Sequence, residues 1–303
     1  MNPVPPGTVP ARVRPPGATL RLLVGLLAML PPALRGASDG VATEEFAVTR
    51  GESTLMVRVQ SPAPERLAAR PLLLLFLSAD RQSSMPDGRY GAPGRIFLEQ
   101  GHRVVSFDLP AHGERVGRHG SGIVGFAAML AAGVDPFALL VADGRAVIDA
   151  CIRRGLAAED RVVAAGVSRG GYGALRLAAA DTRVSAVAAL APATDWRVLT
   201  EFAALRDDPA VAALALDNFA DQLAGRRIYV AIGNHDLRAR TDACIRFVLA
   251  VTEAERRGES GRSSVRFHVV DDSRGHALAA KWREEGTRFL LEAAGTAEGG
   301  QMP

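Results

Sequence analysis

The chain has 303 residues, of which 48% are hydrophobic and 23% are charged, as in globular proteins that bury a sizeable core. Only 5% are aromatic, fewer than a surface that stacks nucleic-acid bases usually carries. Of the 36 basic residues, four arginines lie within residues 1–38, where there is no acidic side chain; the rest of the chain has 32 basic against 33 acidic residues. This balance argues against a nucleic-acid partner.

The first 40 residues have the pattern of an export signal followed by a linker. Three arginines within residues 12–21 precede an apolar run at residues 22–34, and small residues at positions 36–38 offer a cleavage site. The run is about 13 residues long and contains two prolines, whereas a membrane-spanning helix needs roughly 20 apolar residues. We expect a periplasmic or secreted protein without a stable membrane span; a cytoplasmic location follows if this segment is not a signal.

After residue 40, short aliphatic runs alternate with longer segments of helical periodicity. Residues 44–48 and 54–59 flank a turn at residues 50–52, which predicts an antiparallel hairpin. The later predicted strands are residues 71–77, 102–107, 161–166, 184–190, 228–232 and 265–270. The predicted helices are residues 91–100, 121–155 with a break near 133–136, 170–180, 195–224, 240–256 and 277–293. This alternation predicts an α/β fold, with a mostly parallel central sheet flanked by helices.

We expect one such α/β domain at residues 41–296, with at most a small cap around residues 195–225 and a disordered tail at residues 297–303. Nothing in the sequence gives the oligomeric state. Ligands of open parallel sheets bind beyond the carboxyl ends of the strands. The residues that directly follow the predicted strands are therefore the candidates for a functional site.

The two cysteines, Cys151 and Cys244, lie in separate predicted helices and outside any CxxC or metal-like cluster. Both are expected to be buried thiols that pack as small hydrophobic residues. A disulfide between them is the alternative if the protein is exported.

The strongest chemical signal is the pentapeptide Gly-Val-Ser-Arg-Gly at residues 166–170, which fits the G-x-S-x-G pattern. It follows a predicted strand and opens a predicted helix, where a tight turn lifts the serine oxygen above the edge of the sheet. Such a turn strains the backbone of the serine, and the flanking glycines let strand and helix approach each other. We therefore predict that Ser168 is a nucleophile.

A nucleophilic serine needs a base, and a histidine in a loop after a strand is the candidate to look for. His276 lies in the polar loop after the last predicted strand, at the same edge of the sheet as Ser168. His112 also follows a strand but is expected to shape its own loop, and His268 lies within a strand, where a structural role is expected.

The base in turn needs a carboxylate that orients it. Asp236 directly follows the predicted strand at residues 228–232 and is the candidate, with Asp242 and Asp195 as alternatives. The chain order Ser168, Asp236, His276 then differs from the orders of the chymotrypsin and subtilisin classes.

An oxyanion hole is expected from the backbone N–H of Arg169 and from one donor in the loop after residues 71–77, either Ala79 or Asp80. Residues 233–236, Gly-Asn-His-Asp, are similar to a motif of metallophosphatases. The Asp-x-His and the further histidine motifs that would complete a metal site are missing, so neither a metal nor another cofactor is expected.

With these residues in place, the chain resembles the α/β-hydrolase superfamily, and within it the compact dienelactone-hydrolase and prolyl-oligopeptidase-type catalytic domains. The likeness is carried by residues 106–113, 166–171, 232–236 and 273–276 and covers about residues 45–293. The chain departs from dienelactone hydrolases in having a serine nucleophile in place of their cysteine. It also has no room for the propeller of prolyl oligopeptidases, so the resemblance implies an open or lightly covered site.

These features predict a serine hydrolase that cleaves a carboxylic ester of a small substrate through an acyl-enzyme. A peptidase or an acyltransferase shares the same three residues and is the alternative within this fold. The third hypothesis is a catalytically inactive binding protein that has kept the serine turn.

Overall fold

The computed structural model describes Met1, residues 35–38, 40–51, 53–258 and 263–295. Most of the expected signal and linker, and the expected tail at residues 297–303, lie outside the described residues. All the elements discussed below belong to one unit that begins at Ala33.

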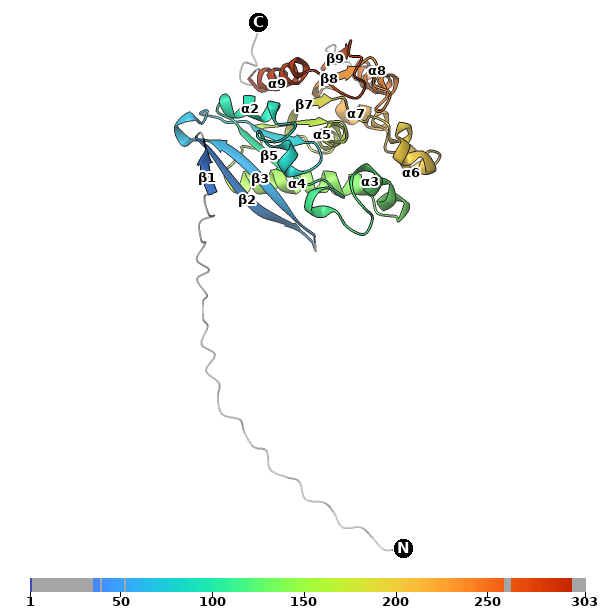
Figure 1. Cartoon of the computed structure of the whole chain (residues 1–303), viewed down its shortest axis with the longest axis horizontal. Coiled ribbons are helices and arrows are strands. Elements are labelled where there is room, and N and C mark those ends of the chain that lie inside the picture. Colours follow the sequence, from blue (N-terminus) through green and yellow to red (C-terminus); the bar gives the residue numbers. More distant parts are fainter. Residues whose placement is uncertain (2–34, 39, 52, 259–262, 296–303) are drawn as a thin grey trace. The chain divides into compact units, whose positions relative to one another are not determined.

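A nine-stranded sheet runs through this unit in the order β1-β2-β3-β5-β4-β6-β7-β8-β9 (Figure 1). Strands β4 to β9 pair in parallel with their neighbours in this group. Strands β1, β2 and β3 pair antiparallel with one another, and β3 pairs antiparallel with β5. The strands are β1 (Arg35–Ser38), β2 (Val41–Arg50), β3 (Ser53–Pro62), β4 (Leu73–Leu77), β5 (Arg103–Phe107), β6 (Val162–Val167), β7 (Val184–Leu190), β8 (Arg227–Gly233) and β9 (Val265–Val270).

This sheet confirms the predicted fold class. The hairpin expected at residues 44–48 and 54–59 is the β2–β3 pair, which is longer at both ends. The sequence did not predict β1, which pairs with β2 inside the segment expected to be signal and linker.

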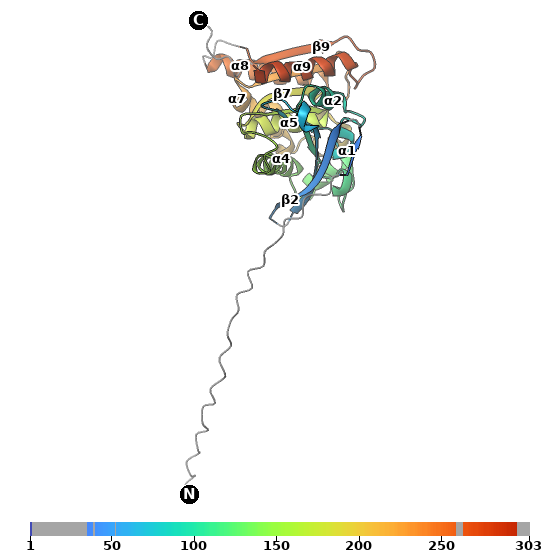
Figure 2. The same cartoon turned by 90° about the vertical axis from the view of Figure 1, so that its left-hand side faces the viewer.

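Helices cover both faces of the sheet because side chains of its central strands alternate between two apolar layers. On β4, Leu73, Leu75 and Leu77 face one layer, and Leu74 and Phe76 face the other. The helices are α1 (Arg81–Ser84), α2 (Ala92–Glu99), α3 (Gly122–Ala131), α4 (Pro136–Arg153), α5 (Arg169–Ala180), α6 (Pro209–Ala212), α7 (Ala220–Leu223), α8 (Thr241–Arg257) and α9 (Ala280–Gly295). Helices α2 and α9 pack on one face, and α3, α4, α5 and α8 on the other. Figure 2 shows α9 and α4 on opposite sides of the sheet.

The predicted helical segment at residues 121–155 divides where the sequence indicated. Helix α3 ends at Ala131, and Asp135 caps the start of α4 by accepting hydrogen bonds from the N–H groups of Phe137 and Ala138. Among the described residues, α3 and α4 have the length and composition of a membrane span only when taken together, across a bend of 112°, and no single helix does.

The segment at residues 195–224, predicted as helical throughout, consists of five short pieces. These are the 3-10 turns η3 (Trp196–Val198), η4 (Thr200–Leu205) and η5 (Leu216–Phe219), together with α6 and α7. Asp195 caps the first turn, and the carboxylate of Asp208 is an internal start signal that caps α6. The pieces pack through a cluster of aromatic rings around Trp196, which is fully buried.

Cys151 on α4 and Cys244 on α8 are free, buried thiols, so the disulfide alternative is not what the structure has. Burial raises the pKa of the Cys151 thiol to about 12 and raises that of Cys244 as well.

We expect neither thiol to react with a thiol-specific disulfide reagent at pH 8 in the native protein, and both to react in urea, because only the thiolate attacks. Rapid reaction of the folded protein would contradict this placement.

Candidate active site

Ser168 lies at the turn between β6 and α5 with φ 56° and ψ −116°, in a backbone region that non-glycine residues seldom adopt. Backbone hydrogen bonds hold this strained turn. The Ser168 N–H donates to the Leu190 carbonyl (2.9 Å), and the Ser168 carbonyl accepts from the Tyr172 N–H (3.1 Å). The strain expected from the sequence is therefore present, and it places the serine side chain beyond the carboxyl end of β6.

The two glycines of the motif are required by close backbone contacts. A Cβ atom on Gly170 would lie 2.0 Å from the Leu77 carbonyl oxygen, and one on Gly166 would lie 2.2 Å from the carbonyl carbon of Gly170. No side chain can occupy that space without moving backbone. The end of β4 thus packs directly against the turn that carries Ser168.

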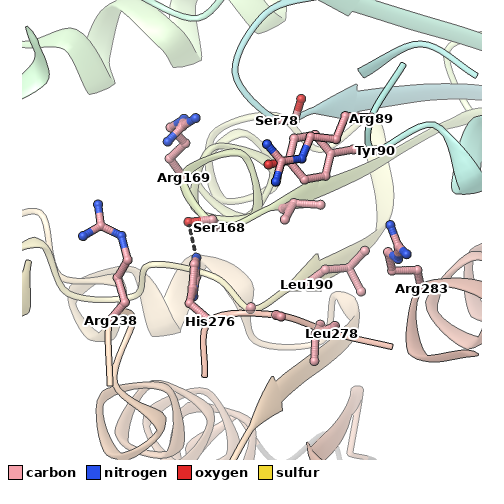
Figure 3. A pocket seen from close by; sticks show the side chains of 13 residues that line it. Ser78, Arg89, Tyr90, Ser168, Arg169, Leu190, Arg238, His276, Leu278 and Arg283 are labelled. Atoms are coloured by element: carbon pink, nitrogen blue, oxygen red, sulfur yellow. Dashed lines mark hydrogen bonds between the residues drawn. The ribbon is translucent and has the colours of Figure 1, made fainter. Parts of the chain in front are cut away.

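The structure brings the three predicted catalytic side chains into one chain of hydrogen bonds. His276 Nε2 lies 2.9 Å from the Ser168 Oγ, and His276 Nδ1 lies 2.7 Å from the Asp236 Oδ2. Figure 3 shows the first of these contacts at one side of a pocket. Each residue follows a different parallel strand, β6, β8 or β9, so the shared edge of the sheet brings them together.

Asp236 is held rigidly behind the histidine. It is only 2% exposed, and its Oδ1 accepts hydrogen bonds from the N–H groups of Arg238 (3.0 Å) and Ala239 (2.9 Å). Its second oxygen is left for His276. This arrangement fixes both the position of the carboxylate and the orientation of the ring.

The alternative carboxylates are engaged elsewhere. Asp242 pairs with Arg240 and Arg246 at the start of α8, and Asp195 pairs with Arg197 while it caps η3. Neither Asp242 nor Asp195 contacts His276.

The other histidines that the sequence singled out also lie away from Ser168. His112 is buried, and its neutral ring donates from Nδ1 to the Pro110 carbonyl (2.8 Å), as expected of a loop-shaping residue. His268 lies on β9 between the rings of Tyr229 and Trp282. Within the part of the chain that the structure describes, no group of three or more His, Cys, Asp or Glu side chains could hold a metal ion.

Of the expected oxyanion donors, Arg169 lines the pocket beside Ser168, whereas Ala79 and Asp80 do not. Arg169 is the first residue of α5 and lines the pocket beside Ser168, and its N–H lies at the helix N-terminus, where the helix dipole favours negative charge. In the loop after β4, Ser78 lines the pocket, whereas Ala79 and Asp80 do not. The Ala79 carbonyl instead accepts from the Leu109 N–H (3.0 Å), and Asp80 caps α1.

Asp108 fixes this loop, a role that the sequence did not reveal. Its carboxylate accepts from the backbone N–H of Arg81 (2.8 Å), from the Arg81 guanidinium (2.6 Å) and from the N–H of Glu114 (2.9 Å). Because Asp108 directly follows β5, its place at the edge of the sheet was the available signal. Through Arg81 it ties the loop after β4 to the loop after β5.

The pocket beside Ser168 has a volume of about 260 Å³. It is lined by Ser78, Arg89, Tyr90, Val167, Ser168, Arg169, Leu190, Ala191, Arg238, His276, Ala277, Leu278 and Arg283. These residues come from several loops at the carboxyl edge of the sheet and from the start of α9. The size suits a small molecule better than a long chain segment.

The order of the strands and the strained serine turn define an α/β-hydrolase fold. The sequence model of the prolyl oligopeptidase family matches residues 138–280, a segment that includes Ser168, Asp236 and His276. No curated protein matches the chain.

Solved structures show the same fold at low sequence identity. The acetyl xylan esterase from Paenibacillus sp. R4 has a TM-score of 0.64 and 16% identity, over 86% of this chain and 87% of its own. A cold-adapted esterase from an Arctic intertidal metagenomic library has a TM-score of 0.60 and 17% identity, over 87% and 99%. Dipeptidyl peptidase 4 of Porphyromonas gingivalis has a TM-score of 0.61 and 16% identity over 83% of this chain, which spans only 35% of that peptidase.

A Bacteroides ovatus chain described as a dipeptidyl aminopeptidase IV is likewise spanned over only 36% of its length. The chain therefore has an α/β-hydrolase fold, and the prolyl oligopeptidase model matches a little less than half of it. This partial family match and the fold together support a serine hydrolase.

Replacing Gly170 with alanine is expected to destabilise the protein by about 3 kcal/mol or more, because the new Cβ would force β4 away from the serine turn. The urea midpoint measures this change. Gly117→Ala is the matched control, since a Cβ there meets no atom within 4 Å, and its midpoint is expected to stay close to that of the wild type. Equal midpoints for the two variants would contradict the packing argument.

A second prediction concerns His112, because burial lowers its pKa to about 4 from an ordinary 6.5. The unfolded chain takes up this proton more readily, so stability is full above pH 6.5 and falls as the pH drops toward 4, by up to about 3 kcal/mol. His112→Asn should remove that part of the acid sensitivity. Thermal unfolding at pH 7 and pH 4.5 tests this, and equal pH dependence in both proteins would contradict it.

Proposed function

We propose that this protein is a serine hydrolase that cleaves carboxylic esters of small substrates through an acyl-enzyme. The observation that carries the proposal is the continuous hydrogen-bonded chain from Ser168 through His276 to Asp236, open to a pocket at the serine end.

The geometry supports a definite sequence of proton transfers. The Ser168 hydroxyl donates to His276 Nε2, so the histidine can take that proton as the oxygen attacks the acyl carbon of the ester. Asp236 accepts from Nδ1–H and stabilises the imidazolium that forms. The histidine then protonates the departing alkoxide, and the acyl group stays on Ser168. The same ring then takes a proton from water, which attacks the acyl carbon. The bond between this carbon and Ser168 Oγ breaks, the ring returns the proton to Oγ, and the acid leaves.

The Arg169 N–H and the positive end of α5 supply negative-charge stabilisation while the carbonyl oxygen becomes an oxyanion. The second donor is proposed to come from the loop after β4, which Asp108 holds in place. Ala79 and Asp80 are the residues that the fold suggests, although Ser78 is the member of this loop that lines the pocket.

Two features favour esters over peptides. The pocket is small, and the residues that line it include no aspartate or glutamate that would bind the amino group of a peptide N-terminus. A peptidase is the second candidate, because the family model is that of the prolyl oligopeptidases and because two structures of the same fold are described as dipeptidyl peptidases.

The decisive experiment treats the folded protein with a fluorophosphonate, locates the adduct by mass spectrometry and measures the hydrolysis of 4-nitrophenyl acetate and butyrate. We expect one adduct, on Ser168, and a loss of at least about 10³-fold in kcat/KM in Ser168→Ala and in His276→Ala, because the members of such a triad act as a unit. Asp236→Asn is expected to lower kcat/KM strongly while the fold is kept.

Ser121→Ala is the matched control, since Ser121 is exposed and its side chain caps no helix. It should be labelled and should hydrolyse esters like the wild type. Hydrolysis of dipeptidyl 4-nitroanilides without ester hydrolysis would favour the peptidase. Absence of any adduct on a folded protein would refute the serine mechanism.

A further inference from the structure

The pocket beside Ser168 is lined by four arginines, Arg89, Arg169, Arg238 and Arg283, and by no acidic side chain among the residues that the structure describes. They come from separate parts of the chain: the segment before α2, the first residue of α5, the loop after β8 and the first turn of α9. Elsewhere most arginines described by the structure have a carboxylate partner, as Arg274 has in Asp272. The concentration of positive charge in this pocket therefore distinguishes it from the rest of the described structure.

Only one of the four is neutralised by an ion pair. The Arg238 guanidinium lies 2.5 Å from the Glu201 carboxylate. Within the described residues, Arg89, Arg169 and Arg283 form no ion pair. Asp80 and Glu201 are near enough to act electrostatically on Arg169. Their hydrogen bonds go elsewhere: Asp80 accepts from the Ser83 N–H, and Glu201 accepts from Arg238.

Burial makes this arrangement costly for the empty protein. The Nε atoms of Arg169 and of Arg283 are buried, and neither has a hydrogen-bond partner among the described residues. A buried charged donor without a partner costs free energy. Burial also lowers the pKa of the Arg169 guanidinium, because removing the charged form from water costs free energy. An anionic ligand would remove it.

The arginines lie around the reacting serine. In Figure 3, Arg238 lies to one side of the Ser168–His276 pair and Arg283 to the other, while Arg89 and Tyr90 lie across the pocket from Leu278. A bound molecule would thus meet an apolar floor of Leu190 and Leu278 and positive charge at its ends.

We infer that the ester cleaved at Ser168 is an anion, which carries a carboxylate a few bonds from the ester group and binds the unpaired guanidiniums of Arg89, Arg169 and Arg283. The inference rests on the proposed esterase function and adds the class of substrate. A guanidinium binds a carboxylate through paired N–H donors, a geometry that lysine lacks. The carboxylate can belong to the acyl part or to the alcohol part of the ester, and the two cases are separated by experiment.

The test compares two pairs of esters that differ only in charge. For the acyl part, monomethyl glutarate is compared with methyl 4-carbamoylbutanoate; for the alcohol part, 4-acetoxybenzoate is compared with 4-acetoxybenzamide. Products are measured by chromatography, with Ser168→Ala as the blank. In at least one pair we expect kcat/KM to favour the carboxylate by about tenfold or more at low salt, as charge-assisted hydrogen bonds would give. The preference should shrink as NaCl is added, whereas turnover of the amides should not change with salt.

Variants then assign the preference to the pocket. Arg283→Gln and Arg89→Gln should each lower the ratio of carboxylate to amide turnover severalfold. Arg288→Gln is the matched control on the same helix, because Arg288 is exposed, pairs with Glu284 and does not line the pocket. Its ratio should equal that of the wild type. If the pocket variants fail to fold, the salt dependence of the wild type still decides the question.

Ratios near one in both pairs, or turnover of the amides alone, would overturn the inference and leave the esterase proposal standing. Loss of all four activities in a protein that also lacks a Ser168 adduct would overturn the proposed function, and the inference with it.

Discussion

The site depends on the close approach of one strand end to the serine turn. Gly170 lies so near the carbonyl of Leu77 that no side chain fits between them, and Gly166 lies equally near Gly170. This contact locks the carboxyl end of β4 to the start of α5, which sets the distance between Ser168 and the loop after β4. Ser168 keeps its strained conformation because the strand before it and the helix after it both pack in the apolar core. The free energy that favours this packing therefore holds the serine in place beside the pocket.

The triad could be predicted from the sequence because each member is marked locally. Ser168 has a motif with its own backbone geometry, and Asp236 and His276 each follow a strand that is recognisable by its apolar run. A parallel sheet places all such positions at one edge, so residues 68 and 40 positions apart in the chain meet there. The fold class was predictable for the same reason, since strands buried on both faces leave a continuous apolar pattern.

The remaining features depend on contacts that the sequence does not display. The four pocket arginines are separated by up to 194 positions, and nothing in the chain distinguishes Arg89 or Arg283 from the many arginines on the surface. The start of α6 within residues 195–224 depends on whether Asp208 acts as a cap, which the sequence alone does not decide. The strand β1 lies in a segment whose composition indicated a signal and a linker. The contacts between Asp108 and Arg81 could not be predicted, because they form only once the loops after β4 and β5 lie side by side.

The order of the strands gives the three proposed catalytic groups unequal protection. Ser168 and Asp236 follow β6 and β8, which have neighbours on both sides, whereas His276 follows β9, the last strand of the sheet, which is only partly buried. A strand with one neighbour and incomplete cover opens more readily than the interior of the sheet. His276 thus follows an edge strand that is incompletely covered. Local opening of β9 would disconnect His276 while Ser168 and Asp236 stay in place, so the hydrogen-bonded chain could break without unfolding of the whole domain.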